Sequence, residues 1–199
     1  MTLRKLYSRQ PAGPRARGVV EWNQDFAWFR KNEAAQFLPA NPKNGETHEI
    51  PAALIMRLAK YHFTDTVRLF CDPYPARCVK TAELTSTILK AGKDLVSIRL
   101  NGAVHSAQDD LPKWGTTGDQ ARIPRRPDRS FDATLLGYAT YDVRKRMFTE
   151  FELVAFGSHS GGGRRSFEDP VAMGVVLTLV SDSPVDRVEP LHFKRYGWK

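Results

Sequence analysis

The second half of the chain alternates apolar and polar residues along two stretches, residues 82–104 and residues 131–157. Each stretch places β-branched and aromatic residues on both sides of a short polar turn, which is typical of a β-hairpin. In the first stretch Val96, Ile98 and Leu100 alternate with polar residues, so one face of that strand is apolar. The pattern therefore predicts an antiparallel sheet with one face that needs a cover.

Two earlier segments have the spacing of amphipathic helices. In residues 23–38 three phenylalanines fall along one helical stripe, and a proline at position 39 ends the pattern. Residues 51–63 begin with a proline that suits the first turn of a helix. We interpret His62, on the apolar stripe of this second segment, as a core residue rather than a ligand. The stripe comprises Leu54, Ile55, Leu58, Ala59 and His62.

Together these patterns predict an α+β domain, in which two N-terminal helices pack on a five- to six-stranded antiparallel sheet. Residues 173–180 are apolar on both faces, so we expect them to form a central or fully covered strand. Residues 1–20 contain prolines and glycines that oppose regular structure, which predicts a flexible basic arm. Residues 21–199 are long enough to bury a sizeable core, and we expect them to form a single domain.

Composition and charge narrow the class of protein. The 199-residue chain is 41% hydrophobic, which argues against global disorder. No stretch approaches the roughly 18 continuous apolar residues of a membrane-spanning helix. The net charge is +8, and residues 1–17 hold five basic residues and no acid, which leaves +3 for the remainder. We interpret this segment as a solubilising extension, with attraction to a polyanion or an anionic membrane surface as the functional alternative.

Residues 158–163 read Ser-His-Ser-Gly-Gly-Gly, which superficially resembles a catalytic loop. A working triad needs a base that a carboxylate orients, and no G-x-S-x-G motif is present. A flexible connector is the simpler interpretation. The alternative is anion binding, because successive glycine amides can form a nest that neighbouring arginines would close. The candidate binding residues are therefore His159, Arg164 and Arg165, with Tyr141 and His105 as secondary candidates.

Metal ligands are only weakly indicated, because the five histidines are scattered and no two of them have the spacing of one helical turn. Cys71 and Cys78 are separated by six residues and have no second cysteine pair beside them. We therefore predict no metal and no cofactor. A disulfide between the two cysteines is geometrically feasible, and two unrelated buried thiols are the slightly favoured alternative.

Adjacent basic residues occur on a predicted hairpin turn, residues 144–146, and on two predicted loops, residues 125–126 and 164–165. If these segments converged at one end of the sheet, they would form a surface for nucleic acid or another polyanion. Turn residues are usually charged because they are solvated, and the aromatic residues fall mainly at presumed core positions rather than beside these cations. The pattern therefore does not favour nucleic acid as the partner.

The chain contains, in this order, the segments WNQDFAWF, LAKYHFTDTVR, KTAELTSTIL, VSIRLNGA, LLGYATYDVRKRMFTEFELVAFGSHSGG and MGVVLTL. In this order they resemble segments of an uncharacterised bacterial protein family whose members usually look secreted. The resemblance covers roughly residues 21–181 and implies no activity and no catalytic residues. It implies a signal segment upstream of this chain, whereas residues 1–18 contain no apolar stretch of signal-peptide length. We expect a cytoplasmic protein if Met1 is the true start, and a periplasmic or secreted one if an upstream signal was lost.

A patterned sheet without a convincing catalytic set leads to our first functional hypothesis, a non-catalytic binding or envelope-associated domain. The first alternative is a polyanion binder that uses the basic arm and the turn tips, and its affinity would fall steeply with added salt. The second alternative is a hydrolase centred on His159, which requires a carboxylate within hydrogen-bond reach of that imidazole.

Overall fold

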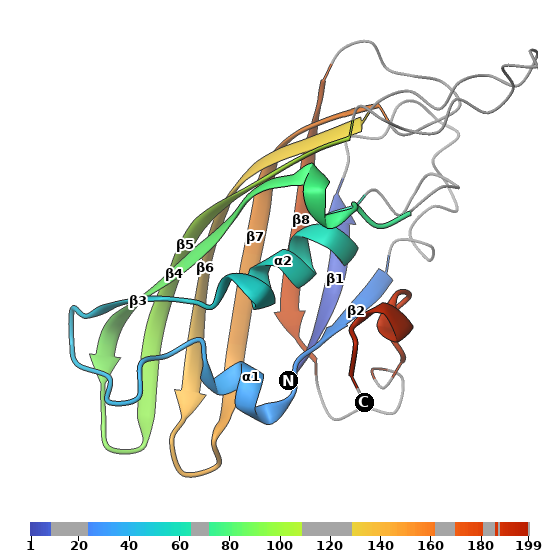
Figure 1. Cartoon of the computed structure of the whole chain (residues 1–199). Coiled ribbons are helices and arrows are strands. Elements are labelled where there is room, and N and C mark those ends of the chain that lie inside the picture. The colour runs from blue at the N-terminus through green and yellow to red at the C-terminus, as the bar shows by residue number, and fades with distance from the viewer. Residues whose placement is uncertain are drawn as a thin grey trace, which may run out of the picture.

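The computed structural model describes residues 1–8, 24–64, 72–108, 129–161, 170–180, 186 and 188–198. Within these residues eight strands form one antiparallel sheet in the order β2-β1-β8-β7-β6-β5-β4-β3 (Figure 1). The strands are β1 (Thr2–Ser8), β2 (Gln24–Trp28), β3 (Thr47–Glu49), β4 (Val79–Ala91), β5 (Leu95–Gln108), β6 (Arg129–Asp142), β7 (Met147–Gly161) and β8 (Val171–Leu179). The helices are α1 (Lys31–Ala35) and α2 (Ala52–Tyr61), with single 3₁₀ turns η2 (Ala76–Cys78) and η5 (Phe193–Arg195).

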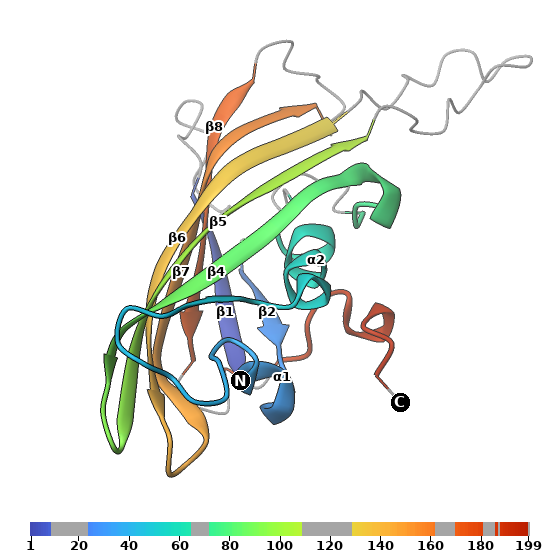
Figure 2. The same ribbon diagram turned by 60° about the vertical axis from the view of Figure 1, so that its left-hand side comes forward.

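The sheet is strongly bent, and its two faces have different surroundings. The helices α1 and α2 lie in the hollow of the sheet, and residues 188–198 lie beside them (Figures 1 and 2). Among the described residues no helix or strand covers the opposite, convex face. The described part of the chain therefore buries its apolar residues in one core, between the concave face and the helices.

Glycines allow the central strands to bend this sharply. A Cβ atom on Gly137 of β6 would lie 2.2 Å from the backbone oxygen of Glu152 on β7. A Cβ atom on Gly157 of β7 would lie 1.8 Å from the backbone oxygen of Asp132 on β6. Real Cβ atoms do not approach backbone this closely, so only glycine permits the observed spacing. Glycines in strand interiors are a common means of curving a sheet.

The core is built by alternation along the strands and by one face of α2. Leu135 and Leu153 point from β6 and β7 into the hollow and are fully buried. Ile55 and Leu58 of α2 are equally buried in the same core, where α2 packs on β4 and β5. Each such side chain contributes about 1.5–3 kcal/mol of burial free energy, so α2 is held mainly by this apolar face.

The predicted arrangement of two helices on a five- to six-stranded sheet is wrong. The described residues form eight strands, and α2 is the one helix among them that is seven or more residues long. The segment predicted as the first helix instead supplies β2 and the five-residue α1. In β2 the backbone hydrogen bonds to β1, with Asp25 opposite Lys5, and this strand pairing overrides the helical spacing of the phenylalanines.

The antiparallel pairing that the alternating stretches predicted is confirmed. β4 pairs with β5, and β6 pairs with β7, each in antiparallel register. β8 is a central strand, as expected, because β1 and β7 flank it. The predicted apolar stripe of the second helix is buried on α2 and continues into His62. No described helix has the length and apolar character needed to cross a membrane.

Seven of the first eight residues of the segment predicted as an arm belong to the sheet. Thr2–Ser8 form β1, which lies between β2 and β8 and pairs antiparallel with both. Residues 9–23 lie outside the described residues, and the assignment of residues 21–199 to a single domain stays a prediction. Cys78 is buried and carries a free thiol, whereas Cys71 lies outside the described residues.

Candidate functional site

The structure does not bring the sequence-predicted site residues together. His159 lies on the concave face of β7 with 2% of its surface exposed. Tyr141 is also on the concave face, but it pairs with Phe148, eleven positions before His159 on β7. At about 3.3 Å per residue these positions are roughly 36 Å apart. His105 is on the convex face, 3.5 Å from Asp132, and Arg164 and Arg165 lie outside the described residues.

The surroundings of His159 along the sheet are apolar. Its register neighbours are Phe131 on β6 and Val171 on β8. Phe131 is fully buried and packs against Phe63 at a ring distance of 6.2 Å. A hydrolase centred on His159 would need a substrate to reach this covered position, and that hypothesis stays a prediction.

Of the three basic segments identified in the sequence, residues 144–146 lie within the described part of the chain. Residues 144–146 form the turn between β6 and β7. The strand ends Gln108, Arg129 and Gly161 lie at the opposite end of the same strands. Residues 125–126 and 164–165 lie outside the described residues, so the convergence of the three basic segments stays a prediction.

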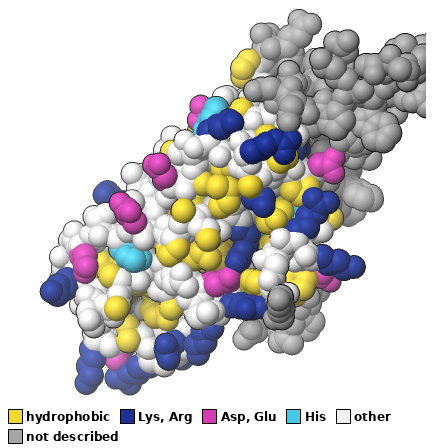
Figure 3. Space-filling view, viewed as in Figure 1, with side chains coloured by type: hydrophobic (Ala, Val, Ile, Leu, Met, Phe, Trp, Pro, Cys, Tyr) yellow, Lys and Arg dark blue, Asp and Glu magenta, His cyan; other side chains and the backbone are white. Residues whose placement is uncertain are grey.

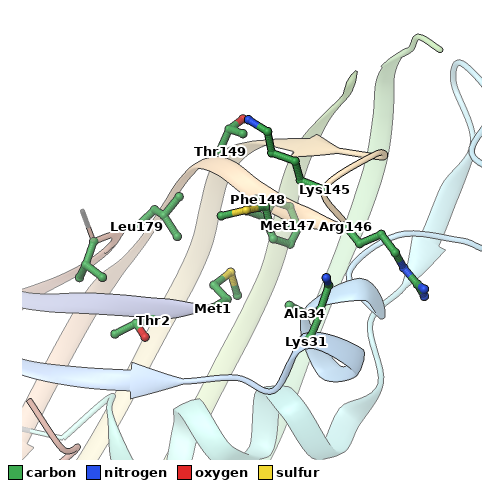
Figure 4. A pocket seen from close by; sticks show the side chains of 11 residues that line it. Met1, Thr2, Lys31, Ala34, Lys145, Arg146, Met147, Phe148, Thr149 and Leu179 are labelled. Carbon is green, nitrogen blue, oxygen red and sulfur yellow. The ribbon is translucent and has the colours of Figure 1, made fainter. Parts of the chain in front are cut away.

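A pocket of about 530 Å³ opens at the β6–β7 turn end of the hollow, beside α1. Figure 4 shows its side chains coming from α1, from the β6–β7 turn and the start of β7, from the start of β1 and from the end of β8. We call it the α1 pocket. Its volume is within the range typical of small-molecule sites. It is lined by Met1, Thr2, Lys31, Ala34, Lys145, Arg146, Met147, Phe148, Thr149, Leu179 and Val180.

The turn between β6 and β7 positions two of the pocket's basic residues. The backbone N–H of Lys145 donates to the Asp142 carboxylate at 2.8 Å, and this bond lowers the pKa of Asp142. Arg146 adopts the left-handed conformation, with φ of 55°. The preceding residue, Arg144, instead forms an ion pair with Asp94 in the β4–β5 turn. Lys145 and Arg146 therefore line the pocket, whereas Arg144 does not.

α1 supplies the third basic residue of the pocket, Lys31. The one carboxylate of α1, that of Glu33, is already engaged in hydrogen bonds. Glu33 accepts a hydrogen bond from the Arg30 backbone N–H at 2.8 Å, which caps the helix. It also receives two bonds from Arg57, at 2.9 and 2.5 Å. Burial by itself would raise the pKa of Glu33, but these bonds outweigh it and hold the pKa below the usual value. Glu33 is thus neutralised by Arg57 and does not line the pocket.

The α1 pocket combines an apolar interior with a cationic rim. Phe148 and Ala34 are buried apolar residues in its wall. Lys31, Lys145 and Arg146 are exposed, and no Asp or Glu is among the lining residues. Figure 3 shows Lys and Arg side chains gathered at the end of the molecule where the turns lie. Such a pocket is chemically suited to a molecule with an apolar body and an anionic group.

A second polar cluster joins the C-terminal segment, residues 188–198, to α2 and β2. His62 Nδ1 lies 3.1 Å from the Asp25 carboxylate, and His62 Nε2 is hydrogen-bonded to the Tyr196 hydroxyl. The Leu191 backbone N–H also donates to Asp25, at 2.9 Å. Burial raises the pKa of Tyr196. Because both nitrogens of the fully buried imidazole are engaged, this cluster holds the fold rather than contacting a substrate.

A third cluster surrounds Arg129 at the far end of the concave face. Its guanidinium donates to Gln108 at 2.8 and 3.0 Å and to the Asp72 and Pro73 carbonyls at 2.7 and 3.0 Å. It also lies over the Tyr74 ring at 4.3 Å. These contacts occupy most of the guanidinium donors, so Arg129 ties residues 72–74 to the sheet rather than offering an anion site.

Sequence reasoning identified part of the α1 pocket and missed the rest. Lys145 and Arg146 were recognised as a basic turn, but Lys31 was placed within a longer helix with no role. The apolar wall was not singled out, because no local signal showed that this part of the core is open. Among the described residues no group of three or more His, Cys, Asp or Glu side chains could hold a metal ion. No protein-family model, curated protein or solved structure matches this chain.

Proposed function

We propose that this protein is a non-catalytic binding domain whose α1 pocket takes a small anionic amphiphile, such as a medium-chain carboxylate or alkyl sulfate. The observation that carries the proposal is the pairing of an apolar pocket wall with three basic residues and no acid. The alkyl chain would contact Phe148 and Leu179, and the head group would lie among Lys31, Lys145 and Arg146.

The two parts of the ligand would contribute differently. Removing the alkyl chain from water supplies about 25 cal/mol for each Å² of apolar surface buried. The head group gains less, because Lys145 and Arg146 are exposed and water and salt screen their charges. Arg146 can bind a carboxylate or sulfate with two parallel hydrogen bonds, which adds preference for a planar or tetrahedral oxyanion. We therefore expect the alkyl chain to contribute most of the binding free energy and the basic rim to select ligands with an anionic head group.

Isothermal titration calorimetry of the full chain with decanoate tests the proposal, with decanol and decyltrimethylammonium as the neutral and cationic comparisons. We expect decanoate to bind at least about tenfold more tightly than either comparison. The double variant K145Q/R146Q should lose most of that preference. The matched control is Arg144→Gln, in the same turn but paired with Asp94 outside the pocket, and it should bind decanoate like the parent protein.

A pocket-filling variant separates the pocket from the surface charge around it. Ala34 is buried in the pocket wall, and replacing it by leucine would place additional side-chain atoms in the cavity. Ala34→Leu should weaken decanoate binding while the variant keeps the circular dichroism of the parent. The proposal would be contradicted if the parent protein bound decanoate and decanol with equal affinity. It would also be contradicted if Ala34→Leu and K145Q/R146Q both bound decanoate as tightly as the parent protein.

The polyanion alternative has one observation in its favour. The β6–β7 turn and the β4–β5 turn lie side by side, because the Val143 backbone N–H donates to the Asp94 carbonyl at 2.9 Å. Lys93 and Arg144–Arg146 therefore share one exposed end of the sheet. A polyanion bound there would lose affinity steeply between 50 and 200 mM salt, by about tenfold or more for a few phosphate contacts. Heparin binding that salt leaves unchanged excludes this alternative.

A further inference from the structure

The convex face of the central strands carries large apolar side chains where an antiparallel sheet normally presents polar ones. Leu136 and Tyr138 of β6 are 49% and 55% exposed, and Phe156 of β7 is 63% exposed. Val154 and Val176 are partly exposed beside them. Because Leu136, Val154 and Val176 are consecutive register partners, the apolar side chains form one continuous patch. Continuous exposed apolar patches on a folded chain mark interaction surfaces.

Charged residues flank this patch symmetrically about β6. Tyr138 pairs with Arg99 on β5 at one side and with Glu152 on β7 at the other. A cation and a carboxylate thus lie about 4.8 Å to either side of the β6 axis. Both side chains are exposed, and neither forms an ion pair with another described residue.

The register partners of Thr134 form a second row across β5, β6 and β7, and this row differs in side-chain size from one side of β6 to the other. Thr134 pairs with Ala103 on β5 at one side and with Phe156 on β7 at the other. The β5 side of this row therefore presents a small side chain, and the β7 side presents a large one. The convex face is thus complementary to itself about a line along β6, in charge at Tyr138 and in size at Thr134.

We propose that two copies of this chain associate through their convex faces about a two-fold axis parallel to β6. Such an axis places β5 of each copy over β7 of the other. Arg99 of one copy then faces Glu152 of the second, and the reverse pair forms at the same time. Phe156 of each copy packs on the small Ala103 of the other, and Leu136 lies near the axis. The proposal concerns the face opposite the α1 pocket and holds whether or not that pocket binds an amphiphile.

Sedimentation velocity of the full chain over 1–300 µM tests this dimer. The wild-type protein should shift from the monomer mass to twice that mass as its concentration rises. Arg99→Glu and Glu152→Arg should each weaken the association about tenfold or more, because each creates two like-charge contacts. The charge-swapped double variant R99E/E152R rebuilds both ion pairs and should return to within about threefold of the wild-type dissociation constant.

Two further variants locate the surface. Phe156→Ser should abolish the dimer by removing the apolar contact with Ala103. Glu83→Arg is the matched control, because this exposed carboxylate is on the convex face of β4, away from the axis and opposite no cation of the second copy. Circular dichroism should be unchanged in every variant. A wild-type monomer at 300 µM, a dimer that Phe156→Ser leaves intact, or a double variant as weak as the single ones would overturn the proposal.

Discussion

The imidazole of His62 and the carboxylate of Asp25 form a buried pair, with Nδ1 of His62 3.1 Å from Oδ2 of Asp25. The imidazole is completely buried, and Asp25 is 5% exposed. In the neutral imidazole Nδ1–H donates to Asp25, and Nε2 accepts from the Tyr196 hydroxyl. The His62 side chain, in this single tautomer, therefore joins the end of α2 both to β2 and to the C-terminal segment.

Acid should destabilise the protein through His62. Burial lowers the pKa of His62, and the charges of Lys5 and His192 act in the same direction, against the opposing effect of Asp25. The unfolded chain takes up the proton near pH 6.5, whereas the folded chain resists it. Stability is therefore lost as pH falls below about 6.5, by up to about 1.4 kcal/mol per pH unit. Urea unfolding at pH 7.5 and pH 5.5 measures this slope.

Asp25 adds a separate effect at lower pH. Burial by itself would raise the pKa of Asp25, but the bonds from His62 and Leu191 and the charge of Lys5 hold it below the usual value. Its contribution is therefore lost only below about pH 4. His62→Gln should flatten the slope between pH 7.5 and 5.5, and His48→Gln, at a half-buried histidine on the edge strand β3, should not. An unchanged slope in His62→Gln would contradict the assignment.

Tyr196→Phe should loosen the C-terminal segment. The variant leaves the buried Nε2 of His62 without its hydroxyl partner, which should cost about 1–3 kcal/mol of unfolding free energy. Hydrogen exchange of the amides in residues 188–198 should accelerate more than that of β6. Tyr138→Phe, at a tyrosine exposed on the convex face, is the control and should change stability by less than about 0.5 kcal/mol.

Arg57→Met should destabilise the junction of α1, α2 and the C-terminal segment. The guanidinium pairs with Glu33 through two bonds and lies over the rings of Tyr196 and Trp198 at 4.9 and 5.2 Å. Removing it leaves a largely covered carboxylate without its cation, for an expected loss of about 2–4 kcal/mol. In the double variant R57M/E33Q the charge is gone as well, so thermal unfolding should recover part of this loss. If R57M/E33Q were as unstable as Arg57→Met, the packing of Arg57 on the rings, and not its charge, would account for the lost stability.

Gly137→Ala should be severely destabilising even though it adds one methyl group. The new Cβ would lie 2.2 Å from the Glu152 backbone oxygen, and backbone in the centre of a sheet cannot move without breaking its ladder. We expect a loss of more than about 2 kcal/mol in chemical denaturation. Thr134→Ala, at an exposed position of the same strand, should change stability by less than about 0.5 kcal/mol.

One part of the α1 pocket could be predicted from the sequence, and the other part could not. Lys145 and Arg146 were visible as a basic turn, because turn signals are local. That Lys31 would lie across the same pocket depended on α1 being a five-residue helix beside β7, which no local pattern indicated. His62 was correctly interpreted as a core residue, but its partners Asp25 and Tyr196 are 37 and 134 positions away along the chain. Contacts of that separation have no local periodicity to reveal them.

The amino-acid sequence by itself determined the antiparallel pairing of β4 with β5 and of β6 with β7, because alternation and turn chemistry operate between neighbouring residues. It also determined the buried face of α2. Only the tertiary structure decided that Thr2–Ser8 and Gln24–Trp28 are strands, since their conformation depends on backbone hydrogen bonds to β8 and to each other. The same long-range pairing bent the sheet, opened the α1 pocket and exposed the apolar convex face, because curvature belongs to the assembled sheet and not to any one strand.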